Sequence, residues 1–219
     1  MEKITAYLKE NQYWDQIVKQ ELGALWKYGV ERITDTNIKE AVIDFLENVA
    51  PVGFFVNPAS ASHKYHPRWQ CKKSGILRNT TECCLLVDRF LQNDAEFCNE
   101  KGEVLSKFRD IVLAATILSD TFKYGYRRID PENPQSGLLN REHGKIAAGK
   151  WRASKKALQV QLEVREAIYE AIYWHVGRWT PGWTPGLPIS KLTYITHTID
   201  IVLTEKSLEI AFDAKEVIK

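Results

Sequence analysis

The sequence predicts an all-α protein, built as a helical bundle with an N-terminal helical extension. Apolar residues recur at spacings of three and four through most of the 219 residues, whereas the sustained alternation that is typical of strands does not occur. Two long segments, residues 51–74 and 126–139, interrupt this helical pattern. Hydrophobic residues make up 44% of the chain and charged residues 26%, which is typical of a soluble globular protein.

The N-terminal part is predicted to be helical over two segments. The first carries apolar residues on helical repeats from Ile4 to Trp26, and the second runs from Asn37 through Leu46. Pro51 ends the second, because a proline disfavours helical geometry at the residue before it. We expect residues 1–50 to form a helical subdomain or cap, and residues 51–219 to form the main helical domain.

The segment over 51–74 is predicted to be an irregular but ordered loop. Loops of this length are usually functional or disordered, and its four aromatic side chains would be costly to leave in water. We expect helices to resume at Ser74 and again at Glu103, the second ending near Gly125. After a second long loop, further helices are expected from about Asn140, over 160–175 and from Ser190.

A short tandem repeat separates the last two predicted helices. Residues 179–182 read WTPG, and residues 183–186 repeat the same four letters. This segment is either an aromatic flap over a site or a cover for the core, and the sequence leaves both interpretations open.

The charge and the length of the apolar runs limit the classes of partner. A formal net charge of +2 argues against a protein that coats extended nucleic acid, although a local basic pocket stays open. The apolar runs are far shorter than the roughly 20 residues of a membrane span, and the N-terminus has no signal-peptide core. We expect a cytoplasmic protein without membrane contact, and the sequence leaves a homo-oligomer open.

Several ionisable residues fall on helix faces that are otherwise apolar. Asp120 follows Leu113, Thr116 and Ile117 at spacings of seven, four and three, which places all four on one face. His175 repeats this situation at the end of its own helix. A carboxylate on such a face needs a metal ion, a lysine or a histidine close by, because an unpaired buried charge is costly.

Two acids and two histidines are thus expected to point inward from four helices: Asp120, His143, His175 and Asp200. Helical bundles assemble metal sites in this way. Taken singly, each residue has an ordinary structural explanation, since an inward histidine is more often hydrogen-bonded within a core. No P-loop, Rossmann glycine pattern, G-x-S-x-G or H-E-x-x-H motif offers another site.

The order of several motifs resembles that of the HD-domain metal-dependent phosphohydrolases. Residues 58–67 read PASASHKYHP and residues 74–80 read SGILRNT, similar to a P-A-S-x-S-x-K-Y-H-P loop and a G-G-L-x-R-H-T helix. Residues 118–125, LSDTFKYG, look like the family's L-H-D-x-x-K-x-G signature. Later segments are similar to its three remaining histidine motifs: EHG at 142–144, HVGRW at 175–179 and THTID at 196–200.

This resemblance implies an HD-like helical bundle with long loops at the mouth of a pocket. It also implies that four residues are metal ligands: Asp120, His143, His175 and Asp200. The expected cofactor is a weakly bound divalent metal, which is Mn, Fe, Ni, Zn or Mg, or no cofactor at all. Asn79 and Ser119 stand where the family has metal-binding histidines. Because amide and hydroxyl oxygens bind transition metals less well than imidazole, the usual metal is expected to be weak or absent.

Two arrangements of the remaining residues stay open. Asp120, His143 and His175 correspond to the ligands of a second metal in two-metal members of the family, so a single shifted metal is one interpretation. A metal-free hydrogen-bonded network is the other, and the loss of two ligands favours it. The expected ligand-binding residues are Ser60, Ser62, Lys64, His66, Arg78, Asn79, Ser119, Lys123, Arg178 and Trp179.

The leading expectation for function is an HD-like protein that binds a nucleotide or another phosphate-bearing small molecule. It would sequester or sense this ligand, with hydrolysis lost or impaired. The alternative is an active metal-dependent phosphohydrolase or phosphodiesterase, with Asp120 and Lys123 as its catalytic residues. A third interpretation is a scaffold whose former pocket is only core.

Overall fold

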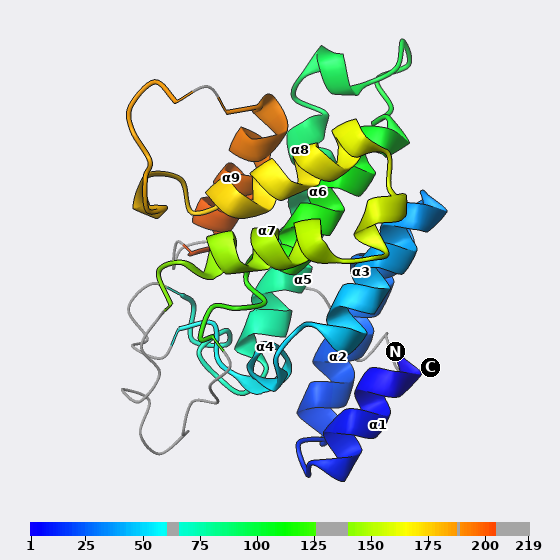
Figure 1. Ribbon diagram of the computed structural model, residues 1–219, viewed down its shortest axis with the longest axis vertical. Helices are drawn as coiled ribbons and strands as arrows, with labels where there is room; N and C mark the ends of the chain where they lie inside the picture. Colours follow the sequence, from blue (N-terminus) through cyan, green and yellow to red (C-terminus); the bar gives the residue numbers. More distant parts are fainter. Residues whose placement is uncertain (61–65, 126–139, 188, 205–219) are drawn as a thin grey trace.

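A computed structural model describes residues 1–60, 66–125, 140–187 and 189–204. Within these ranges the chain is helical, and its only extended pairing is an isolated bridge between Cys98 and Val104 (Figure 1). The predicted all-α class is therefore confirmed for this part of the chain. None of the described helices combines the length and the apolar character that crossing a bilayer requires.

Three helices form the N-terminal part: α1 (Glu2–Glu10), α2 (Gln16–Tyr28) and α3 (Thr36–Asn48). The first predicted segment is thus two helices, and the chain turns between them at Gln12, which has a positive φ of 61°. Capping carboxylates define the starts of the next two. Asp15 accepts a hydrogen bond from the amide of Val18, and Asp35 accepts one from Ile38, each at 2.9 Å.

The segment predicted to be irregular contains one short helix, α4 (Val52–Val56). The prediction is wrong at these residues because Pro51 precedes a compact apolar run that buries itself as one helical turn. The rings of Phe54 and Phe55 pack edge to face at 5.3 Å, and both side chains are buried. The expectation that the aromatic residues hold this segment against the body is thus confirmed for these two rings.

Two helices form the centre of the bundle, α5 (Gly75–Leu91) and α6 (Ser106–Ser119). Helix α5 packs against α2, α4, α6 and α9, while α6 packs against α3 and all three later helices. Helix α6 ends well before Gly125, where the sequence predicts its end. The hydroxyl of Thr121 donates to the carbonyl of Leu118 at 2.7 Å, so the chain leaves the helix in tight turns.

The remaining helices cover this centre: α7 (His143–Ala153), α8 (Leu162–Trp174) and α9 (Lys191–Thr204). Each begins within one helical turn of its predicted start. Helix α8 packs against both α7 and α9, and α1 to α3 lie on the opposite side of the bundle from α9 (Figure 1). This packing brings the end of α6, the start of α7 and the end of α8 together in the interior.

One hydrophobic cluster extends from the N-terminal helices into the rest of the bundle. It includes Leu22 of α2 and Phe45 of α3 together with Leu113 of α6, all of them inaccessible to solvent. The ring of Phe45 packs edge to face on that of Phe122 at 6.4 Å. The predicted division after residue 50 stays a prediction.

Candidate metal centre

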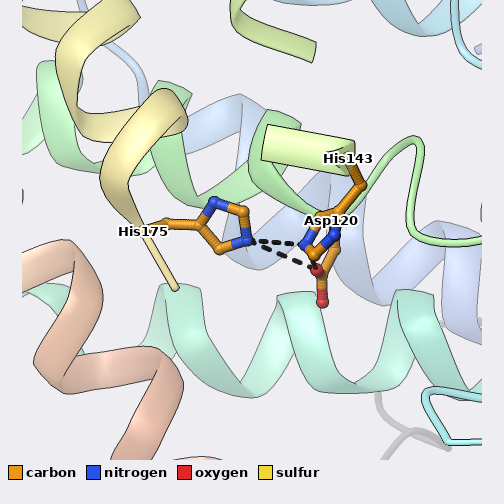
Figure 2. A group of neighbouring side chains, drawn as sticks. All are labelled: Asp120, His143 and His175. Carbon is orange, nitrogen blue, oxygen red and sulfur yellow. Dashed lines mark hydrogen bonds and ion pairs between the residues drawn. The ribbon is translucent and has the colours of Figure 1, made fainter. Parts of the chain in front are cut away.

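Asp120, His143 and His175 meet in the interior at the ends of three helices (Figure 2). Asp120 directly follows α6, His143 is the first residue of α7, and His175 directly follows α8. Their side chains point toward one another and are almost completely buried, with exposed fractions of 3%, 3% and 0%. The inward orientation that the sequence predicts for these residues is thus present.

One potential ligand atom from each residue faces the other two. Nε2 of His143 lies 3.2 Å from Oδ1 of Asp120, and Nε2 of His175 lies 3.6 Å from the same oxygen. The two Nε2 atoms are 3.0 Å apart. Since zinc, for example, takes imidazole nitrogen and carboxylate oxygen at about 2.0–2.2 Å, this group could hold a metal ion with small adjustments of its side chains.

Backbone carbonyls determine where both imidazole rings carry their protons. Nδ1 of His143 lies 2.7 Å from the carbonyl oxygen of Asn140, and Nδ1 of His175 lies 2.7 Å from that of Ile172. A carbonyl only accepts, so both Nδ1 atoms donate. In the neutral rings both Nε2 atoms then present lone pairs to each other and to a carboxylate. The arrangement requires a positive charge, either a metal ion or a proton on one ring.

The electrostatics of the group distinguish the two histidines. Burial opposes the charged form of His175, but its hydrogen bond to Asp120 and the charge of that carboxylate prevail, and the pKa of His175 is raised. For His143 burial prevails, and its pKa is lowered. Burial raises the pKa of Asp120, but the charge of Lys123 and the hydrogen bonds to both histidines prevail and hold this pKa well below the usual range. His175 is therefore the ring that takes the extra proton when no metal is bound.

The second oxygen of Asp120 is held by a buried lysine. Nζ of Lys123 lies 2.8 Å from Oδ2 of Asp120 and 3.5 Å from Nε2 of His66. Burial, followed by the positive charge of Lys123, lowers the pKa of His66 to about 4, so this ring is neutral near pH 7. Nδ1 of His66 lies 2.8 Å from Oε1 of Gln70 and therefore donates to this oxygen. Nε2 of the same neutral ring is then the atom that accepts from Lys123.

This chain of polar groups continues into α5. Gln70 donates to Oε2 of Glu82 at 2.6 Å, and the other oxygen of Glu82 accepts from the side chains of Arg78 and Trp69. Arg78 also lies 3.8 Å from a carboxylate oxygen of Glu21 in α2. The guanidinium of Arg78, expected to bind phosphate, is thus placed among carboxylates, and its ligand-binding role stays a prediction.

A small cavity lies beside Asp120. Its volume is about 10 Å³, room for one water-sized particle and too little for a phosphate group. Burial and the neighbouring charge of Asp120 raise the pKa of Asp200 at its edge. The cavity brings together three further residues that the sequence predicts for the site, among the lining residues Asn79, Thr80, Cys83, Thr116, Ser119, Asp120, Thr196 and Asp200.

The other expected ligand-binding residues take varied positions. Ser60 is buried, while Ser62 and Lys64 lie outside the described residues. Arg178 and Trp179 are exposed in the turn after His175, with the guanidinium 4.5 Å from the centre of the indole ring. Among the described residues, no hydrogen bond or ion pair joins these two side chains to the Asp/His/His group.

The structure adds His197 as a residue that supports the group, a role that the sequence pattern does not reveal. Its Nδ1 lies 2.6 Å from the carbonyl oxygen of His175. Its ring also occupies the space beside Gly177, where an added Cβ would come within 2.3 Å of the imidazole. The φ of Gly177 is +56°, a region that favours glycine. Together these residues fix the backbone that carries His175.

No protein-family model, no curated protein and no solved structure matches this chain. The fold and the site define a protein that is helical over the residues the structure describes and that carries a buried Asp/His/His group able to hold a metal ion.

Proposed function

We propose that this protein is an HD-like domain that binds a nucleotide or another phosphate-bearing small molecule beside a divalent metal ion held by Asp120, His143 and His175. The observation that carries the proposal is the approach of two imidazole Nε2 atoms to each other and to one carboxylate oxygen, with both Nδ1 atoms committed to backbone carbonyls. Two imidazoles and one carboxylate suit Mn, Fe, Ni or Zn better than Mg.

The HD-like assignment is supported by the order of the motifs and by the way their residues meet. Residues from the motifs at 118–125, 142–144 and 175–179 make up the Asp/His/His group. Residues from the motifs at 74–80 and 196–200 line the adjoining cavity together with Asp120. Five segments that are far apart in the sequence thus contribute to one place in the interior.

The group would supply three protein ligands, which would leave at least one coordination position for a ligand oxygen or water. A divalent ion bound here would supply Lewis acidity toward a phosphoryl oxygen. Lys123 keeps Asp120 ionised by pairing with its Oδ2 atom, and Nε2 of His66 in turn accepts a hydrogen bond from the ammonium of Lys123. These buried contacts keep the donor set arranged before any ligand arrives, which lowers the cost of binding.

Hydrolysis is proposed to be lost or impaired. Asn79 and Ser119 provide oxygen atoms at the positions where the resembling family has imidazoles, so a second transition metal would be poorly held. The cavity next to Asp120, with a volume of about 10 Å³, is also too small for a phosphate as the side chains lie in this structure.

A second candidate function is an active metal-dependent phosphohydrolase or phosphodiesterase. Three protein ligands with an open position are typical of catalytic metal sites, whereas structural sites are usually closed by four. In this case Asp120 and Lys123 would be the catalytic residues, Asp120 by holding the metal ion and Lys123 by stabilising the charge of the reacting phosphate.

The test combines metal loading with a nucleotide panel. Chelator-treated protein is titrated with Mn²⁺ or Zn²⁺, and its Tm is then measured with each nucleotide. We expect one metal per chain, a rise in Tm with at least one nucleotide only in the metal-loaded protein, and loss of both in His143→Gln. The control variant Glu142→Gln should keep the metal, because this carboxylate, although next to His143 in the sequence, pairs with Lys145 at the exposed surface.

The outcomes separate the two candidates. Fast turnover of a nucleotide or phosphodiester by the metal-loaded protein, abolished by Asp120→Ala, would replace the binding proposal with the enzyme. A protein that takes up neither metals nor nucleotides would contradict both.

A further inference from the structure

We propose that Gln70 and Glu82 are positioning residues for the buried ammonium of Lys123. They act through His66, whose ring lies between Gln70 and this ammonium. The ammonium pairs with Oδ2 of Asp120, so the orientation of the whole chain of groups reaches the Asp/His/His group. The consequence for a metal ion at Asp120 rests on the function proposed above, whereas the positioning itself does not.

The groups of this chain are shielded from solvent. The exposed fractions of Gln70 and Glu82 are 0%, and those of His66 and Lys123 are 4% and 8%. Solvent therefore cannot easily replace a lost hydrogen bond, and each buried donor needs an acceptor within the protein. This requirement restricts the chain to few arrangements of its protons.

The direction of the hydrogen bonds is determined at Glu82. Its Oε1 atom accepts from Nε of Arg78 at 2.5 Å and from Nε1 of Trp69 at 3.2 Å, and both of these groups only donate. Burial raises the pKa of Glu82, but these donors and Gln70 oppose the rise. The Oε2 atom of Glu82 lies 2.6 Å from Nε2 of Gln70. Because Glu82 accepts at both oxygens, Gln70 presents its NH₂ group to this carboxylate.

The orientation of Gln70 in turn determines the tautomer of His66. Its Oε1 atom faces Nδ1 of His66 at 2.8 Å, and an amide oxygen only accepts, so Nδ1 carries the proton. The neutral ring then presents the lone pair of Nε2 to Lys123 at 3.5 Å. An ammonium has no lone pair, so only this tautomer can accept from it. In the other tautomer, an N–H group would face the ammonium and repel it.

The backbone of Gln70 is fixed as well as its side chain. Its carbonyl oxygen accepts from the amide of Ala59 at 2.8 Å. Gly75, the first residue of α5, lies so close that an added Cβ would come within 1.7 Å of the same oxygen. The loop thus packs directly on the start of α5, and Glu82 lies about two turns further along that helix. This close contact determines the distance over which Gln70 meets Glu82.

The positioning leaves Asp120 with one oxygen for a metal ion. Oδ2 pairs with Lys123 at 2.8 Å, whereas Oδ1 lies 3.2 Å from Nε2 of His143 and 3.6 Å from Nε2 of His175. A metal ion held with the two imidazoles would therefore meet a carboxylate that offers a single oxygen. Partners of this kind orient metal-binding groups and tune the affinity for the ion.

Long-range ¹H–¹⁵N NMR of the metal-free protein reads the tautomer directly. At pH 7 the wild type should show a neutral His66 with its proton on Nδ1, and a slowly exchanging ammonium of Lys123. Gln70→Met removes the amide and keeps the length of the side chain, so Nδ1 loses its acceptor. We expect this tautomer to lose its dominance and the ammonium signal to weaken. Spectra of His66→Gln and Lys123→Arg assign the two signals.

A double variant tests the direction of the hydrogen bonds without removing them. Gln70→Glu combined with Glu82→Gln exchanges the amide and the carboxylate. The carboxylate at position 70 can accept from His66, while the amide at position 82 donates to it and accepts from Arg78. This variant should keep the wild-type tautomer and ammonium signal. The control Trp69→Phe removes a donor to Glu82 that lies outside the path to His66, so it should keep both signals too.

Zinc titration connects the positioning with the proposed metal centre. Gln70→Met should weaken Zn²⁺ binding by at least about threefold, which is less than the roughly 10–100-fold loss that is typical when a direct partner of a metal ligand is removed. The double variant should bind Zn²⁺ like the wild type. Unchanged affinity in Gln70→Met would overturn the consequence for the metal. A wild type that takes up no Zn²⁺ would contradict the proposed function, and the NMR signals alone would then decide the positioning.

The NMR experiment has two outcomes that overturn the inference. One is a wild-type His66 with its proton on Nε2, and the other is a Gln70→Met protein that keeps both signals unchanged. Should Gln70→Met fail to fold, the wild-type tautomer and the double variant decide the outcome, and loss of the Nδ1–H tautomer in the double variant would overturn the inference.

Discussion

Single contacts of the backbone decide what the side chains at the centre of this protein can do. The carbonyls of Asn140 and Ile172 take the Nδ1 protons of the two histidines, so both Nε2 atoms are left to face Asp120. The lone pairs of these Nε2 atoms can lie beside the carboxylate because a metal ion or a proton can be held between them. The same reasoning applies to Gly177, whose missing side chain makes room for the ring that supports His175.

Gly177→Ala should destabilise the protein by at least about 1–2 kcal/mol, because it places a side chain in the left-handed region and against His197. Gly182→Ala is the matched control. Its φ is +89°, but no atom lies within 4 Å of an added Cβ, so only the backbone strain applies. Urea unfolding gives the free energy of unfolding of both variants. An equal loss of stability at the two positions would show that the contact with His197 does not contribute to it.

Asp120→Asn should be among the most destabilising single changes in the metal-free protein. It leaves Lys123 buried without its counter-ion, and breaking a buried pair costs about 3–5 kcal/mol. Asp94→Asn breaks an ion pair with Lys191 at the exposed surface, and it should leave the stability almost unchanged. Chemical unfolding at pH 7 compares the two, and similar small losses would contradict the description of Asp120 as a buried charge.

At the scale of the elements, the apolar spacing is enough to predict most helices. Capping residues such as Asp15 and Asp35 lie where helices α2 and α3 begin, and both are visible in the sequence. The short helix α4 and the early end of α6 could not be predicted in the same way. The first depends on burial of a few apolar residues as a unit, and the second on a hydroxyl of Thr121 that bonds to a local carbonyl.

The contact between α2 and α5 predicts a pH dependence of stability. Burial raises the pKa of Glu21 to about 7, which Arg78 opposes and Glu82 reinforces. Because this carboxyl holds its proton more tightly in the folded protein, its contribution to stability is present at low pH and is lost as the pH rises from about 5 through 7. Glu21→Gln should remove this decline and be more stable than the wild type at pH 8, by about 1–3 kcal/mol.

Urea unfolding at several pH values between 5 and 8 checks this expectation. Glu163→Gln, on the exposed start of α8, should follow the wild-type curve at every pH. A wild-type stability that rises over this range, or a Glu21→Gln curve parallel to it, would contradict the burial of Glu21 between the two helices.

For the molecule as a whole, the site depends on how distant segments pack, which spacing alone cannot predict. The inward face of Asp120 could be read from its neighbours along the helix. Its meeting with His143 and His175 requires α6, α7 and α8 to end or begin at the same place. The cavity beside Asp120 brings together Asn79, Ser119 and Asp200, which the order of the motifs also predicts for the site, whereas the place of Thr116 in its lining depends on how α5, α6 and α9 pack.

A metal ion at the Asp/His/His group would join the ends of three helices, so its removal should loosen this region first. We expect chelation to lower the Tm by several degrees and to speed amide hydrogen exchange near His143 and His175 more than in α2. Exchange measured with and without the metal checks this prediction, and a uniform change over the whole chain would argue against a local site.

The most direct measurement is X-ray absorption spectroscopy of the protein loaded with one equivalent of Zn²⁺. We expect a first coordination shell with the signature of two imidazoles and at least one oxygen, and its loss in His175→Gln. A metal that binds with unchanged coordination in that variant, or a wild type that takes up no metal, would contradict the claim that Asp120, His143 and His175 form a metal centre.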